Sequence, residues 1–124
     1  MPTELTLHIR QTPLHDTHEH LQREPNWLEQ GPDFLQDVFG NYSPHDLISA
    51  GASPEAVQRA VDPSDPDLAA RFEGIREAWE AIQLTGYGEA NRILAEQVYG
   101  IEGWSAAELE KAQARLREWR QPGG

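Results

Sequence analysis

The sequence predicts a mainly α-helical chain with one short β-strand, at about residues 14–20. Three helix starts share one chemical plan, in which a capping Ser or Asp precedes a proline at the first helical position: Ser43-Pro44, Ser53-Pro54 and Asp65-Pro66. Between residues 68 and 82, apolar side chains recur at spacings of four, three, four and three, which predicts one continuous helix face. The strand is predicted from a histidine-rich run that follows Pro13.

Residues 3–12 fit two structures. Leu5, Leu7 and Ile9 alternate with polar residues as they would in a strand. Thr3 followed by Glu4 can instead cap a short helix. The pattern alone leaves both structures open.

His18 and His20 are the candidate metal ligands. In an extended run, Asp16, His18 and His20 point to the same face. Their Cβ atoms then stand about 6.5–7 Å apart, and two imidazoles can bind one cation with Zn–N distances of about 2.0–2.1 Å. In a helix the two imidazoles would point about 200° apart and could not share a ligand easily. A third interpretation is two surface histidines that share nothing.

The flanking residues favour the extended interpretation. Pro13 disfavours helix at Thr12, and the chain becomes polar after Leu21 and reaches Pro25. The strand would therefore be short and would end at its histidines. Metal ligands at the end of a strand are typical of parallel barrels, whose chemistry lies at the carboxyl ends of the strands.

The helix boundaries are predicted from capping residues and from the Gly and Pro residues that interrupt helices. Residues 22–32 are predicted to be a loop because Pro25, Gly31 and Pro32 interrupt them. Gly40 is expected to end the next helix in the left-handed conformation. Ser105 and Glu108 predict a capping box at the start of the last helix. The predicted helices are 32–39, 44–50, 54–61, 66–84 (the longest), one between Gly88 and Gly100, and one from Ser105 to about 120.

Composition excludes several classes of protein. Acidic residues outnumber basic ones 21 to 10, so neither nucleic acid nor an anionic membrane is an expected partner. The chain has no cysteine, which excludes disulfides and thiolate metal sites and leaves imidazole and carboxylate ligands. We expect a cytoplasmic protein, because no apolar run is long enough to span a membrane and the N-terminus does not resemble a signal peptide.

The run Asp16-Thr17-His18-Glu19-His20-Leu21 resembles the first-strand signature of the amidohydrolase superfamily, in the branch of uronate isomerases and amidohydrolase 2 proteins. Residues 46–51 and 99–101 loosely resemble the helical excursion that follows that strand in uronate isomerases. The resemblance implies the opening part of a metal-dependent (β/α)8 barrel, with a short helix before the strand and an excursion over about 32–120. A complete barrel takes about 250 residues. The 124 residues would therefore be an N-terminal segment of a longer protein.

The implied function is that of a metal-dependent hydrolase. His18 and His20 would hold a divalent metal, most simply Zn²⁺, which activates water against a small-molecule substrate. Asp16 would orient an imidazole or would bond to nearby backbone. The remaining ligands and the base would come from later strands, beyond residue 124, so no catalytic residue is placed. Isomerisation of a uronate and decarboxylation are variants within the superfamily.

A second hypothesis is a small, non-enzymatic helical interaction protein, including one that forms a homo-oligomer. In that case the histidine pair is coincidental.

Overall fold

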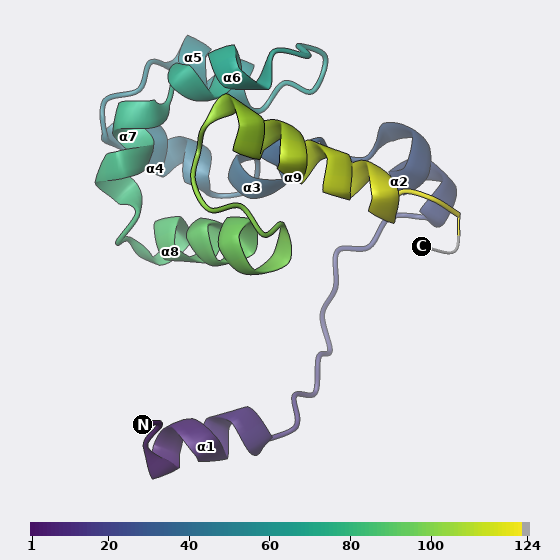
Figure 1. Cartoon of the computed structure of the whole chain (residues 1–124), viewed down its shortest axis with the longest axis vertical. Coiled ribbons are helices and arrows are strands. Elements are labelled where there is room, and N and C mark those ends of the chain that lie inside the picture. The colour runs from purple at the N-terminus through teal and green to yellow at the C-terminus, as the bar shows by residue number, and fades with distance from the viewer. Residues whose placement is uncertain (123–124) are drawn as a thin grey trace.

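The structure is a computed structural model, and it describes residues 1–122, in which every regular element is helical. An N-terminal arm, residues 1–23, extends away from a helical domain, residues 24–122 (Figure 1). The arm contains α1 (Glu4–Gln11). The domain contains α2 (Glu24–Gln30), α3 (Phe34–Phe39), α4 (Ser43–Ser49), α5 (Pro54–Ala60), α6 (Leu68–Glu73), α7 (Arg76–Ile82), α8 (Gly86–Ile93), the π-helical turn η1 (Leu94–Val98) and α9 (Ala106–Trp119).

The predicted strand, and with it the opening of a barrel, is wrong. Residues 13–23 have no regular secondary structure, and the part of the chain that the structure describes has no strand for them to pair with. A strand exists only through hydrogen bonds to a neighbouring strand. The excursion predicted over about 32–120 is instead a helical domain in its own right.

The predicted caps are confirmed at Ser53 and Ser105 but not at Ser43 or Asp65. Ser43 lies inside α4, which has no side-chain cap, and α6 begins at Leu68 with Asp67 as its cap. Ser53 accepts a hydrogen bond from the amide of Ala56 at the start of α5, and Ser105 accepts one from the amide of Glu108 at the start of α9. Thr3 caps α1 in the same way, which confirms the helix among the two structures that residues 3–12 allowed. The capping box is only half present, because the Glu108 carboxylate accepts the amide of Glu102 instead of reaching back to Ser105.

Other boundaries also differ from the prediction, including the start of α8 at Gly86, within the predicted break. The loop predicted over 22–32 contains α2, with Pro25 in its first turn. Gly40 is right-handed, with φ −78°, so it does not form the predicted left-handed cap. The helix predicted over 66–84 is two helices, α6 and α7, separated at Gly74 and Ile75, and α9 is the longest described helix at 14 residues.

The core of the domain is aromatic. Trp79 packs edge-on against Phe39 with ring centroids 5.2 Å apart, and Phe72 stacks on Trp104 at 5.0 Å. Phe72, Ile75 and Trp79 are fully buried, as the apolar stripe predicts. Figure 1 shows α9 crossing the domain, where its apolar side Leu109, Ala112 and Leu116 closes the core.

A buried arginine ties the helices together. Arg71, on α6, is 1% exposed. Its guanidinium forms a two-point ion pair with Asp33, the N-cap of α3. It also donates to the carbonyl oxygens of Arg59, Ala60 and Asp65 at 2.9–3.2 Å. A buried charge is tolerated only when it is paired and hydrogen-bonded in this way.

Gly88 allows α8 to approach the end of α7. A Cβ atom at this position would lie 1.8 Å from the carbonyl oxygen of Ile82, which is too close for any other residue without a backbone shift. Gly51 and Gly100 have positive φ angles of 106° and 74°, and each follows a helical segment as a left-handed residue.

Removal of the charge that faces Arg71 is expected to destabilise the domain strongly. Asp33→Ala leaves a buried guanidinium without its counter-ion and should cost about 3–5 kcal/mol of unfolding free energy. Asp33→Asn should cost less, because an amide oxygen can still cap α3. Urea denaturation measures both variants. Glu73→Ala, which removes an exposed ion pair with Arg76, is the control and should cost about 0–1 kcal/mol. Equal losses of unfolding free energy in Asp33→Ala and Glu73→Ala would contradict a structural role for the buried ion pair.

Ser105→Ala is expected to lower the stability of the domain by about 1 kcal/mol, because it removes the side-chain oxygen that caps α9. Thermal melting beside the parent protein measures the change. Ser49→Ala, at an exposed serine near the end of α4, is the matched control and should lie within about 0.5 kcal/mol of the parent. An unchanged midpoint for Ser105→Ala would mean that the cap does not stabilise α9.

Candidate functional site

The structure brings His18 and His20 together in the arm. Their Nε2 atoms are 2.8 Å apart, and their rings meet edge-on with centroids 4.7 Å apart. Both residues are exposed and lie in the segment of the arm that has no regular secondary structure. The two side chains therefore approach each other without a regular strand, within a turn-containing segment of the arm.

Asp16 bonds to backbone and does not orient an imidazole. Its Oδ1 accepts the backbone N–H of His18 at 3.2 Å, in the manner of an Asx turn. A side-chain hydrogen bond with Glu19, followed by the His18 amide, lowers the pKa of Asp16 below its ordinary value. The bond to Asp16 raises the pKa of Glu19. Of the two roles that the sequence left open for Asp16, the structure shows the local one.

The histidine pair supplies two ligands and no more. Within residues 1–122, no three His, Asp or Glu side chains are grouped closely enough to hold a metal ion. A catalytic zinc site takes three protein ligands and keeps a fourth position for water or substrate. Any metal held here catalytically would need at least one further ligand from outside this group.

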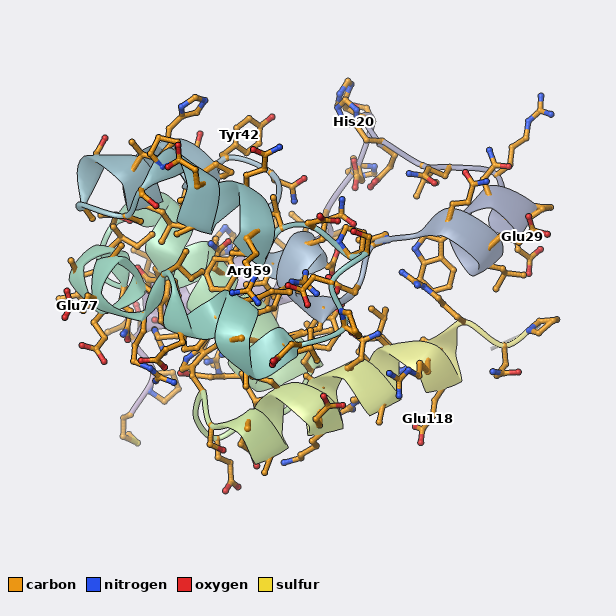
Figure 2. The ribbon with its side chains drawn as sticks, turned by 90° about the horizontal axis from the view of Figure 1, so that it is seen from above. His20, Glu29, Tyr42, Arg59, Glu77 and Glu118 are labelled. Atoms are coloured by element: carbon orange, nitrogen blue, oxygen red, sulfur yellow. The ribbon has the colours of Figure 1, made fainter. Side chains whose placement is uncertain are left out.

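A groove of about 1070 Å³ lies where the base of the arm meets the domain, and His18 and His20 form part of its wall. Trp27 on α2, Tyr42 before α4 and Trp119 at the end of α9 supply its aromatic lining. In Figure 2, His20 and Tyr42 stand on the same side of the molecule. We call this cavity the arm groove.

The groove's polar lining is acidic. It includes the carboxylates of Glu19, Glu24 and Asp37, and no lysine or arginine lines it among the described residues. Asp37 is held in place because Tyr99 donates its hydroxyl hydrogen to Oδ2 at 2.5 Å. Burial, together with this carboxylate, raises the pKa of the Tyr99 hydroxyl well above its ordinary value. Tyr99 therefore stays protonated and remains a donor.

Two arginines stack against the tryptophans of the groove. The Arg120 guanidinium lies over Trp27, 5.2 Å from the ring centroid, and Arg115 lies over Trp119 at 5.4 Å. Indole faces attract cations through their negative quadrupole. Each of these tryptophans therefore has a positively charged side chain against one face, and Arg120 Nε and Nη2 are buried without a hydrogen-bond partner.

Sequence reasoning missed most of this groove. Trp119 packs on the core and also lines the groove, and nothing in the sequence marks the second role. Trp27 lay in a segment predicted to be a loop, and Asp37 and Tyr42 had no distinctive pattern around them. Only the position of Trp27 between Pro25 and Gly31, as a large aromatic residue among breakers, was a signal.

Comparison with known proteins adds no relative. No family model matches the sequence, no curated protein matches it, and no solved structure matches the fold. In the described part of the chain, no helix has the length and apolar character needed to cross a bilayer.

Proposed function

We propose that this chain supplies two metal ligands, His18 and His20, to a metal-dependent hydrolase of the amidohydrolase superfamily. The observation that supports this most is the 2.8 Å approach of the two Nε2 atoms. Two imidazoles bound to one tetrahedral zinc at about 2.0–2.1 Å have nitrogens about 3.3 Å apart. The pair needs to open by only about half an ångström to reach that geometry.

The donor set suits a divalent ion such as Zn²⁺. Neutral imidazole is an ordinary zinc ligand, and the chain offers no thiolate that would compete. A zinc ion held here would supply the usual chemistry of lowering the pKa of bound water toward about 7 and polarising a carbonyl. His18 and His20 would hold and orient it from one side. A further ligand and a general base would come from a segment outside the described residues.

The substrate of such an enzyme would be a small molecule, bound in the arm groove beside the imidazoles. The groove has the size and the mixed aromatic and polar lining of small-molecule sites. The superfamily also contains isomerases and decarboxylases, and the same two ligands serve all three chemistries. We favour hydrolysis, because it is the simplest use of a metal-bound water. We propose the cytoplasm as the location of the enzyme.

Metal binding by the purified chain tests the ligand assignment. Zinc should bind with one ion per chain, and His18→Ala and His20→Ala should each weaken binding by at least about tenfold, because each removes one of two ligands. Isothermal titration with Zn²⁺ measures affinity, and the absorption spectrum of Co²⁺ reports the ligand set.

His15→Ala is the control, because His15 lies in the same exposed segment but outside the pair. It should leave metal binding unchanged. Unaltered affinity in both pair variants, or an equal loss in His15→Ala, would show that the pair does not form the site.

A second function has its own observation. The helix α1 has eight residues and buries none of them, and Leu5, Leu7 and Ile9 are exposed on it. So short a helix is unstable alone in water and needs packing against a partner. The arm has two arginines and three carboxylates, against eight basic and eighteen acidic residues in the rest of the chain. It is therefore the part of the molecule where two copies repel each other least, which supports self-association through α1.

Sedimentation velocity tests this alternative. If α1 joins two copies, the parent chain should show a concentration-dependent dimer, and Leu5→Ser with Ile9→Ser should make it monomeric. Ile48→Ser, at an exposed residue of α4, is the control and should leave the dimer intact. A parent that remains monomeric at high concentration would contradict the interaction hypothesis.

A further inference from the structure

The helix α1 has a largely apolar face that the rest of the chain leaves exposed. Leu5, His8 and Ile9 are three and four residues apart, so they lie on one face of the helix, which we call the docking face. All three side chains are exposed. Figure 1 shows the arm leading α1 away from the helical domain. Because a helix of eight residues needs packing to be stable in water, the docking face requires a partner surface.

The arm groove offers an apolar surface that is open to solvent. Trp27, Tyr42 and Trp119 supply aromatic rings, and Leu21 and Leu28 supply aliphatic side chains. Leu21 is 84% exposed and Tyr42 is 66% exposed, so an occupant of the groove would remove a large apolar area from water. Burial of apolar area is the main favourable term in protein association.

We propose that α1 of a second copy docks into the arm groove, and that the two copies exchange their α1 helices reciprocally. This inference rests on the self-association proposed for α1, and it names the surface that receives the helix. A reciprocal exchange fills both grooves, so association stops at two copies. Residues 12–17 join α1 to His18 in the groove wall. When extended they span about 20 Å, which lets α1 reach a neighbouring copy.

The size of the contact favours the groove over a contact between two α1 helices. An eight-residue helix is about 12 Å long. One crossing of two such helices buries much less than the roughly 800 Å² per partner that is typical of a stable interface. Exchange instead creates two equivalent contacts, each between a helix face and a concave wall. Two aliphatic side chains fill only a small part of a groove of about 1070 Å³, so the space beside the imidazoles stays open to a substrate.

The polar groups of the two surfaces are compatible. The docking face carries no carboxylate, so Glu19, Glu24 and Asp37 in the groove would meet no like charge on it. The His8 imidazole has an N–H donor in either neutral tautomer and can donate it to one of these carboxylates. Guanidinium groups already lie against the tryptophans of the groove, so docking needs no cation from α1.

Two double variants of the full chain test the exchange. Leu5→Ser with Ile9→Ser removes the apolar part of the docking face, and Leu21→Ser with Tyr42→Ser removes exposed apolar side chains of the groove. Sedimentation velocity should show a dimer for the parent, and each double variant should raise the dissociation constant of the dimer at least about tenfold. Ile48→Ser, an exposed residue of α4 that does not line the groove, should leave the dimer unchanged.

A mixture of the two double variants is the decisive measurement. Neither variant alone can form an intact contact, because one lacks the docking face and the other lacks the groove surface. A mixed dimer keeps one intact contact, between the unaltered α1 of one chain and the unaltered groove of the other. We therefore expect the mixture to dimerise at concentrations where neither variant does so alone. Sedimentation with a fluorescent label on one variant measures this.

The outcomes separate this inference from the proposals above. A monomeric parent would overturn both the exchange and self-association. A parent dimer that the α1 variant dissociates and the groove variant does not, or a mixture that stays monomeric, would overturn the exchange alone. Leu21→Ser by itself, in a segment without regular secondary structure, gives a groove variant that leaves the helical domain intact and should also weaken the dimer. Zinc binding by His18 and His20 is measured independently of these results.

Discussion

The buried guanidinium of Arg71 fixes the arrangement of the helical domain. It joins the start of α3, the end of α5 and the following loop to α6, through Asp33 and three carbonyl oxygens. A charge removed from water is stabilised only if each of these acceptors is in position. Segments separated by 38 residues in the sequence are therefore placed by one side chain.

The position of one groove residue depends on the Arg71–Asp33 ion pair, because this ion pair holds the start of α3. Asp33 caps this helix from the Arg71 side, and one turn later Asp37 faces the arm groove. Phe34 and Leu35, which lie between these two residues, are buried, and Phe34 packs against Tyr99, the residue that orients Asp37. The position of the groove's most constrained carboxylate thus follows from the ion pair that anchors the helix.

Several features that depend on residues close together in the chain were predicted from the sequence, although Ser43 and Asp65 do not cap helices as expected. Caps at Thr3, Ser53 and Ser105 act within three residues, so they were recognisable. The break between α6 and α7 was hidden, because the apolar stripe continues through it. The break occurs at Gly74, where α6 passes close to Ala56 of α5, and where the amide of Ile75 bonds to Phe72 three residues back. Such an approach between helices leaves no periodic signal. The strand prediction was wrong, because a strand needs a partner strand and the described chain does not contain one.

The histidine pair could be recognised from the sequence, whereas the groove could not. The pair was recognisable because the two histidines are separated by a single residue, so their side chains can approach each other without any distant segment. The groove was not recognisable, because Trp27, Asp37 and Trp119 meet only after α2, α3 and α9 have packed. The backbone of the arm, with every residue from 12 to 23 exposed, is the least constrained part of the site. In the proposed metal site, two imidazoles would leave half of a tetrahedral ion open, so the remaining ligands would have to come from a structure that packs against this segment. The proposed chemistry would therefore depend on what packs against the arm, whereas the helical domain contributes the aromatic and acidic wall of the groove.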